Sequence, residues 1–292
     1  MSSDFWNKVR SILKKYSVFY AMGLAAAFAL KLYYSRAGVD ELDWILAPTT
    51  WWVQVLSGIN FKKVPGVGYI NHNCEFVIAP VCAGINFMII AFTTLVFSFM
   101  HHMRTVGSRV AWMILSLVII YPYTILVNSL RIIPSIYLLQ MDFYGGLITT
   151  ERVHTMEGTL VYFTALLFLY HIADKVVKRL SSRLSTHFSP RFSPYSQPHQ
   201  SMGPAKEADS LKPAFYAVIK WSLPVFFYFS ITLGIPFLNG AYRNDNGKFL
   251  EYTLLVSGVC FSAIAVTCLF ILLNKCIKRK IVGSSLSDFS KK

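Results

Sequence analysis

The stretch GINFMIIAFTTLVFSFMH, residues 84–101, holds 18 consecutive residues without Asp, Glu, Lys or Arg. About 20 predominantly apolar residues in a helix cross the hydrocarbon core of a bilayer, so this stretch is long enough to span a membrane. Five further stretches are comparably long and apolar, at 16–34, 110–130, 156–173, 214–238 and 253–274. The sequence therefore predicts an all-α, polytopic helical membrane protein with about six transmembrane helices.

The overall composition agrees with this reading. Hydrophobic residues make up 54% of the chain and charged residues 14%, and the mean hydropathy is +0.48. Soluble domains average about 25% charged residues. The net charge of +14 would suit nucleic acid only if the basic residues shared one face. They punctuate the apolar stretches instead, which is typical of topology signals and of contacts with anionic lipids on the cytoplasmic side. We expect no nucleic-acid partner.

The basic residues also indicate an orientation. With the N-terminus in the cytoplasm, 19 of the 28 Lys and Arg residues fall in cytoplasmic segments and 7 in the opposite segments. The remaining two, Lys31 and Lys220, fall within predicted spans. Because cytoplasmic segments of membrane proteins carry an excess of Lys and Arg, we expect both termini in the cytoplasm.

A seventh apolar segment, WILAPTTWWVQVLSGI at 44–59, differs from the six spans. It contains Pro48, two threonines and the pair Trp51–Trp52, and aromatic residues of this kind are enriched at membrane–water interfaces. A full crossing here would break the alternation of loops across the membrane. We expect an interfacial or re-entrant segment, with a short span as the open alternative.

The chain divides at a polar segment rich in Ser and Pro. Residues 181–213 have no apolar periodicity and predict a cytoplasmic linker. It separates a four-span module at 1–180 from a two-span C-terminal hairpin with a basic tail at 214–292. Neither a repeat of 20–50 residues nor an inverted repeat is evident, which argues against a transporter.

With this topology, three reactive side chains meet at the outer membrane face. Cys82 precedes a descending span, Arg131 follows an ascending one, and His154 opens the next descending one. Pro80 suits the first turn of a helix, so we expect Cys82 within that turn, where the helix dipole increases the thiolate fraction. Asn86, four residues later, should share the helix face of Cys82.

Polar residues continue around these three positions. A stripe with helical spacing runs along the predicted third span, and such a stripe must face protein or water. Its members are Tyr121, Thr124, Asn128, Arg131 and Ser135. On the next span, Glu157 lies one turn after His154, and Gly158 permits close helix approach. We take Asn86, Asn128 and Glu157 as supporting or substrate-binding candidates.

The polar loop ahead of Cys82 adds further candidates. KKVPGVGYINHNCEF at 62–76 has Pro and Gly turns, followed by His72 and Glu75. It forms either the lip of a substrate groove or an ordinary polar loop. His72 competes with His154 as the base for the thiol. Cys74 lies in the same outer segment, so a disulfide with Cys82 is an alternative that would consume the nucleophile.

Three short boxes carry a resemblance to a known family. PVCAGI at 80–85, NSLRI at 128–132 and HTMEG at 154–158 resemble, in this order, the signature boxes of the exosortase/archaeosortase family. These are bacterial and archaeal membrane proteins regarded as cysteine transpeptidases. The resemblance covers about residues 17–175. It leaves the C-terminal hairpin and its basic tail outside the matched core.

The resemblance implies a role for each of the three residues. Cys82 matches the nucleophile that forms a thioester with a substrate carbonyl, and Arg131 matches the arginine that would stabilise the oxyanion. His154 would activate the thiol and protonate the leaving amine. The archaeal branch typically has arginine at the position of His154, so the resemblance is to the bacterial exosortases.

The resemblance also implies a substrate class and a location. Exosortase substrates are exported proteins with a C-terminal sorting tag that consists of a short Pro-containing motif, a transmembrane helix and a basic cluster. The enzyme would cleave this tag and transfer the protein to a cell-surface acceptor. We therefore expect a multi-pass protein of the bacterial inner membrane with its active site on the periplasmic face. We expect neither a cofactor nor a metal ion.

Two other functions use different residues. In a transporter or binding subunit, Arg131 and Glu157 would line a substrate path. In a haem protein, His101, His102 and His171 near the inner face would hold the iron. Cys260, Cys268 and Cys276 on the last span have no metal-ligand spacing and fit simple packing.

Overall fold

The computed structural model describes residues 3–73, 75–103, 105–139, 149–187 and 222–289. Over these ranges the chain is mostly helical, and five helical segments are long and apolar enough to cross a membrane. They are Lys14–Arg36, Pro80–His102, Val106–Leu139, Thr150–Leu180 and Gly247–Thr267. Each contains or largely overlaps a span expected from the sequence, which supports a polytopic membrane protein.

The described part of the sixth expected span, 214–238, is too short to count among these candidate membrane-spanning helices. This part is the shorter apolar segment Ser222–Leu238, and residues 214–221 lie outside the described ranges. Within it, helix 222–229 continues into the π-helical turn η3 (Ser230–Gly234) and α7 (Ile235–Leu238). The expected linker also starts later than 181, because the preceding helix is continuous to His187.

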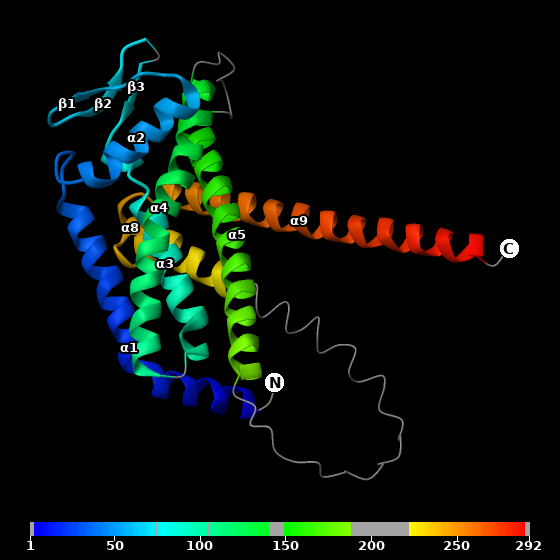
Figure 1. Cartoon of the computed structure of the whole chain (residues 1–292). Helices are drawn as coiled ribbons and strands as arrows, with labels where there is room; N and C mark the ends of the chain where they lie inside the picture. The colour runs from blue at the N-terminus through cyan, green and yellow to red at the C-terminus, as the bar shows by residue number, and fades with distance from the viewer. Residues whose placement is uncertain (1–2, 74, 104, 140–148, 188–221, 290–292) are drawn as a thin grey trace, which may run out of the picture.

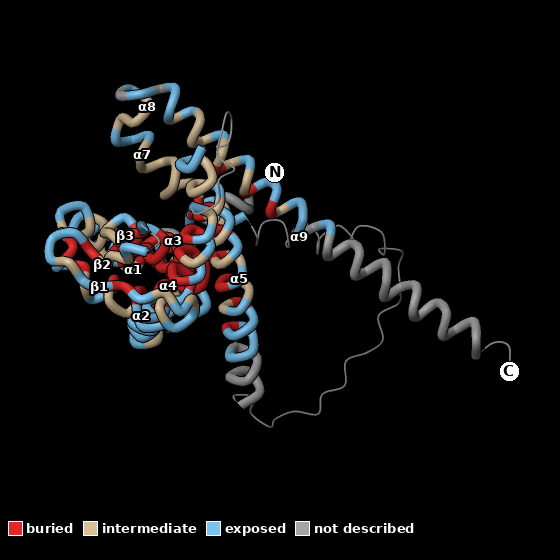
Figure 2. The backbone as a smooth tube through the Cα atoms, turned by 90° about the horizontal axis from the view of Figure 1, so that it is seen from above, coloured by how far each residue is buried: buried red, intermediate tan, exposed pale blue. Residues whose placement is uncertain are grey.

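Four helices form the bundle that holds the candidate site. They are α1 (Ser3–Arg36), α3 (Ile85–Phe99), α4 (Val106–Leu139) and α5 (Thr150–His187), and they run alternately up and down in Figure 1. The central helix is α3, in which 13 of 15 residues are buried. Figure 2 shows these buried residues enclosed by the other helices. The long charge-free run that predicted a span is therefore also the core of the bundle.

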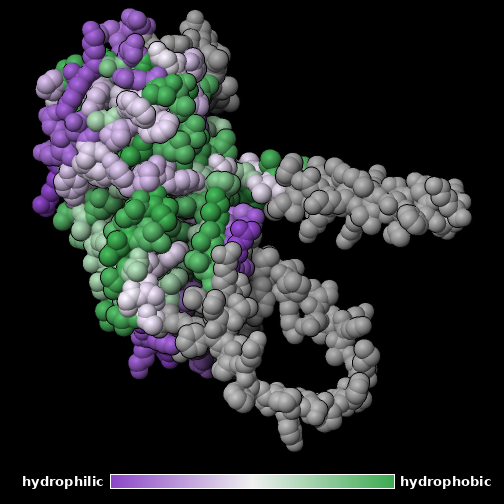
Figure 3. Space-filling model, in the orientation of Figure 1, coloured by the Kyte–Doolittle hydropathy of each residue, from purple (hydrophilic) through white to green (hydrophobic). Residues whose placement is uncertain are grey.

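The surface of this bundle is banded by polarity. Figure 3 shows hydrophobic side chains around the middle of the helices, with hydrophilic side chains gathered at both ends of the view. Helix ends and loops carry the polar residues because an unpaired polar group in hydrocarbon is costly. The band fits a bilayer perpendicular to the bundle axis.

Segment 44–59 forms helix α2 (Asp43–Ser57), which is not among the candidate spans. It packs against α4 at the upper end of the bundle in Figure 1. The side chains turned inward are Ile45, Leu46, Thr49, Thr50 and Val53, whereas Trp44, Trp51, Trp52, Val55 and Leu56 are exposed. One face of α2 thus packs against protein, and the other exposes large apolar side chains.

A small sheet follows α2, which the all-α prediction missed. Strands β1 (Lys62–Val64), β2 (Gly68–Asn71) and β3 (Phe76–Ile78) pair antiparallel in the order β1-β2-β3. Strands of three or four residues are too short to show a period of two in the sequence. The Pro-Gly turn between the first two strands was the available local signal.

The C-terminal hairpin packs on α5 but leaves the bundle axis. It ends in α8 (Ala241–Asn244) and α9 (Asn246–Phe289). Figures 1 and 2 both show α9 projecting away from the bundle at a steep angle to α5. The segment Gly247–Thr267 of α9 is one of the five candidate spans, although α9 is not parallel to the bundle.

Candidate active site

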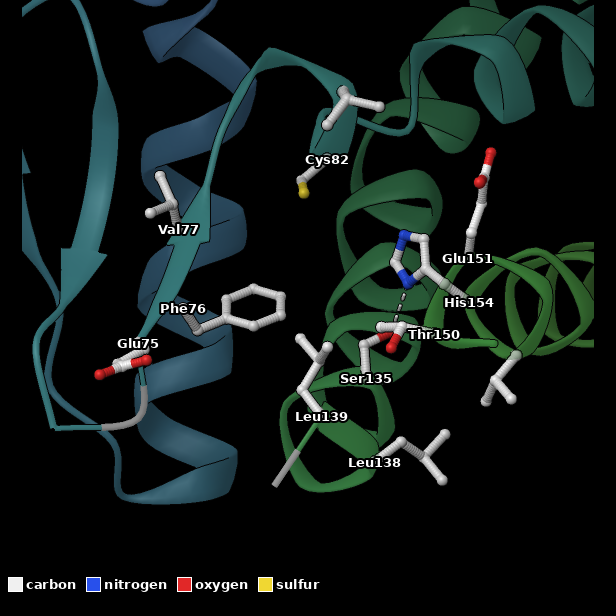
Figure 4. Close-up of a pocket in the computed structure, with 12 residues that line it drawn as sticks. Glu75, Phe76, Val77, Cys82, Ser135, Leu138, Leu139, Thr150, Glu151 and His154 are labelled. Atoms are coloured by element: carbon white, nitrogen blue, oxygen red, sulfur yellow. Dashed lines mark hydrogen bonds between the residues drawn. The ribbon is translucent and has the colours of Figure 1, made fainter. Parts of the chain in front are cut away.

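A pocket of about 560 Å³ lies at the end of the bundle that carries the sheet. Strand β3, the segment after it, the last turns of α4 and the first turn of α5 form its walls (Figure 4). The lining residues are Glu75, Phe76, Val77, Val81, Cys82, Ser135, Leu138, Leu139, Thr150, Glu151, Val153 and His154. Cys82 and His154, distant in the sequence, thus share one cavity, and Figure 4 shows them facing each other across it.

The sequence predicted Cys82 in the first turn of the spanning helix that Pro80 begins. In the structure Pro80 does begin a helical turn that contains Cys82, but this turn is of the 3-10 type and precedes α3. Cys82 ends this turn, η1 (Pro80–Cys82), and its N–H donates to the carbonyl of Ala79 at 2.8 Å. The left-handed Gly84 (φ 70°) then redirects the chain before α3 begins at Ile85. The thiol is free and 5% exposed.

Asn86 is also placed differently from the prediction. Because the chain turns at Gly84, the spacing of four residues no longer puts Asn86 on the side of Cys82. The Asn86 side chain is exposed, and its Oδ1 accepts a hydrogen bond from Lys31 Nζ at 2.8 Å. Asn86 therefore joins α3 to α1 and is not part of the pocket wall.

Asn128 holds the turn that carries the thiol. Its Nδ2 donates to the carbonyl of Cys82, and its Oδ1 accepts from the Tyr162 hydroxyl at 2.7 Å. A Cβ at Gly84 would come within 3.0 Å of Asn128 Cγ and would also need the positive φ, so both space and backbone favour glycine there. The buried Asn128 amide thus contacts the turn that carries Cys82, and its supporting role stays a prediction.

Arg131 is in contact with His154. Its Nη2 lies 2.5 Å from His154 Nε2, and the guanidinium is within electrostatic range of Cys82 and Glu157. Arg131 is 7% exposed and is not among the lining residues of the pocket, so it reaches the site through His154. Gly158 permits this approach, because a Cβ there would lie 3.0 Å from Arg131 Nε.

The proton positions on His154 follow from its partners. Arginine can only donate, so Nε2 of a neutral His154 accepts from Arg131 and the ring proton sits on Nδ1. Nδ1 lies 3.3 Å from Ser135 Oγ, which therefore accepts. The Ser135 hydroxyl then donates to Glu157 Oε2 at 2.8 Å, a shorter contact than the 3.2 Å to the carbonyl of Arg131. A chain of hydrogen bonds thus joins His154 to Glu157.

Two members of this network were missed by sequence reasoning. Ser135 was recognised as part of the polar stripe but not as a site residue, although it lies one turn after Arg131. Tyr162 was not singled out, although His154, Gly158 and Tyr162 follow each other at intervals of four on α5. The Tyr162 ring centroid lies 5.5 Å from the guanidinium carbon of Arg131. Helical spacing on both helices was therefore the signal that could have found them.

The two candidates from the loop ahead of Cys82, Glu75 and His72, differ in their relation to the pocket. Glu75 lines the pocket and has a left-handed backbone (φ 49°), whereas His72 is not among the lining residues. Histidine 154 is therefore the imidazole that the structure brings to Cys82. Cys74, which the sequence offered as an alternative disulfide partner of Cys82, lies outside the described residues.

The residues that a transporter or a haem protein would use are not among those that line the pocket. Neither Arg131 nor Glu157 lines the pocket, and the adjacent His101 and His102 have ring centroids 4.0 Å apart in η2 (Met100–His102), at the opposite end of α3. Within the described ranges, no group of three His, Cys, Asp or Glu residues is placed to hold a metal ion.

Comparison with known proteins found no matching family model, no similar curated protein and no similar solved structure.

Proposed function

We propose that this protein is a membrane cysteine peptidase or transpeptidase of the exosortase type, acting on exported proteins with a C-terminal sorting tag. The observation that carries the proposal is the shared pocket of Cys82 and His154, with Arg131 hydrogen-bonded to the imidazole. A free thiol and a histidine in one cavity are the minimum for thiol-based acyl transfer. The three boxes that resemble exosortases contribute one member each.

The orientation supports a substrate from outside the cell. The pocket lies at the end of the bundle opposite the N-terminus (Figure 1), and the excess of Lys and Arg favours cytoplasmic termini. The pocket then opens at the periplasmic face of a bacterial inner membrane. In this proposal the Ser222–Leu238 segment and α9 complete six membrane-associated segments.

The reaction begins with transfer of the Cys82 thiol proton to His154 Nε2. The thiolate attacks the carbonyl carbon of the substrate, and the C–S bond forms while the carbonyl oxygen becomes an oxyanion. His154 returns the proton to the leaving nitrogen, the C–N bond breaks, and a thioester remains on Cys82. An acceptor amine or water then attacks the thioester, and its proton returns through His154 to the sulfur.

Arg131 has two successive roles in this proposal. In the resting site it donates to Nε2 of His154, the nitrogen that must accept the thiol proton. Binding of the substrate draws the guanidinium toward the developing oxyanion, which releases Nε2. Once there, the hydrogen bond from the guanidinium to the oxyanion would contribute a few kcal/mol to the transition state.

The central test is replacement of the thiol. Cys82→Ala should abolish processing of a reporter precursor that carries a sorting tag, with a loss of at least about a thousandfold. Cleavage is measured by mass spectrometry of the mature C-terminus. Cys260→Ala is the matched control, because Cys260 is a free buried cysteine on α9 and should leave processing intact. Normal processing in the Cys82→Ala variant would refute the proposal, and uptake of a solute independent of Cys82 would favour the transporter.

A further inference from the structure

Strand β3 is an edge strand that faces the pocket. It pairs with β2 on one side, and no other described strand pairs with it on the other. Phe76 and Val77 on this strand and Glu75 just before it line the cavity. In Figure 4 β3 is the part of the sheet nearest His154. Unpaired strand edges readily accept another strand.

The register shows which main-chain groups are free. A Cβ on Gly68, at the start of β2, would clash with the carbonyl oxygen of Ile78, so this carbonyl points toward β2. Residues in an antiparallel pair turn their main-chain groups alternately toward and away from the partner strand. The N–H and C=O of Val77 therefore point away from β2, on the pocket side.

The same strand leads directly to the nucleophile. After Ile78, Ala79 remains extended (φ −105°, ψ 176°), and the turn Pro80–Cys82 follows. A strand rises about 3.3 Å per residue, so a chain paired at Val77 reaches the level of the turn within two or three residues. Across the cavity, Leu138 and Leu139 of α4 supply an apolar wall.

We propose that the free edge of β3 is the substrate-binding site, where an extended peptide pairs its main chain as a fourth strand. This inference rests on the proposed function and specifies how its substrate binds. The substrate chain runs toward the membrane at its tag, and β3 also runs toward the membrane, so the added strand is parallel. Main-chain pairing supplies affinity for any extended segment, and the pocket selects alternate side chains.

A crosslinking experiment tests the strand directly. The enzyme carries Val77→Cys with Cys82→Ala and Cys74→Ser, and the reporter precursor carries single cysteines at successive positions before its membrane helix. Strand pairing predicts disulfides at alternate substrate positions, because side chains of a strand alternate between faces. Crosslinks with a period of three to four, equal crosslinking at all positions, or none would each overturn the proposal.

A second measurement concerns the Val77 N–H. Val77→Pro removes this donor without touching the β2–β3 hydrogen bonds, and it should slow precursor processing about tenfold. Val77→Ala keeps the N–H and should slow processing less. Val77→Ala is therefore the matched control for the loss of the Val77 N–H.

The outcomes separate the strand site from the proposed function. If Cys82→Ala blocks processing but Val77→Pro slows it no more than Val77→Ala does, the strand site is refuted and the proposed peptidase function is retained. If the Cys82→Ala variant processes the precursor normally, both proposals are refuted.

Discussion

Single side chains at the site depend on one another for their protonation. Arg131 donates to Nε2 of His154, so Nδ1 carries the proton and donates to Ser135 Oγ. The Ser135 hydroxyl in turn donates to the carboxylate of Glu157. In the proposed mechanism, the carboxylate of Glu157 would stabilise the imidazolium through Ser135 after His154 takes the thiol proton. Ser135 and Glu157 would then be positioning residues, because they act through His154.

Replacing either positioning residue should slow processing of the tagged precursor. We expect Ser135→Ala and Glu157→Gln each to lose about tenfold or more, the scale of a hydrogen bond to a charged group. Because both act through one chain, the double variant should lose little more than the worse single variant. Processing rates of the four enzymes measure this coupling.

The control for the positioning residues is Ser129→Ala. Ser129 is buried on the same helix, and its hydroxyl donates to the carbonyl of Ile125 at 2.8 Å. It should retain the normal rate. Fully additive losses in the Ser135/Glu157 double variant would contradict the relay.

Among the elements, the sheet is tied to helix α2 by one carboxylate. The Tyr69 hydroxyl on β2 donates to Asp43 Oδ1 at 2.6 Å, and Lys63 Nζ on β1 lies 3.0 Å from Asp43 Oδ2. The hydrogen bond from Tyr69, with that from Lys63, lowers the pKa of Asp43 below its usual range. The sheet that contains β3 is thus attached to α2 through a carboxylate whose charge depends on pH.

This contact predicts an acid sensitivity of the sheet. Asp43 has a lowered pKa when folded, so its contribution to stability is present above the unfolded pKa of about 3.9 and is lost as the pH falls through the folded value. We expect the protection factors of the amides in residues 62–71, which are corrected for the slower intrinsic exchange in acid, to fall selectively on acidification below about pH 4. Asp43→Asn should exchange faster already at neutral pH and lose this dependence. The control is Asp40→Asn, which removes a carboxylate 3.7 Å from Lys63. A pH response of Asp43→Asn identical to that of the unmodified protein would contradict the assignment.

At the scale of the whole molecule, the C-terminal hairpin supports the helix that carries His154. Arg152 on α5 forms an ion pair with Glu251 on α9, and the rings of Phe163 and Tyr228 meet at 5.2 Å. The ion pair is partly exposed and contributes little by itself. The buried α9 residues Val256 and Cys260 therefore hold the hairpin by packing.

A packing variant should reveal this support. Val256→Ala removes buried atoms from α9, and we expect it to lower the Tm in detergent by about 2–4 °C, as a loss of about 1 kcal/mol would. Leu254→Ala is the matched control, because Leu254 is 64% exposed on the same helix. Thermal inactivation of precursor processing measures both. Equal effects of the two changes would show that α9 does not pack as described.

The sequence by itself determined the membrane class, the approximate positions of five candidate spans and the polar stripe on α4, of which Thr124, Asn128, Arg131 and Ser135 are buried and Tyr121 is exposed. These follow from run length, charge placement and helical spacing, which are local properties of the chain. Sequence reasoning also brought Cys82, Arg131 and His154 to one end of the bundle, because alternating spans place their ends on alternate faces.

Only the tertiary structure decided the contacts between these elements. The turn at Gly84 moved Cys82 out of the helix and Asn86 out of the site, and the pairing of three short strands created an edge beside the pocket. The hydrogen bond from Arg131 to His154 and the chain through Ser135 to Glu157 depend on how α4 packs against α5. Partners of this kind lie many residues apart, and which atoms meet is set by packing between helices, which no local pattern encodes.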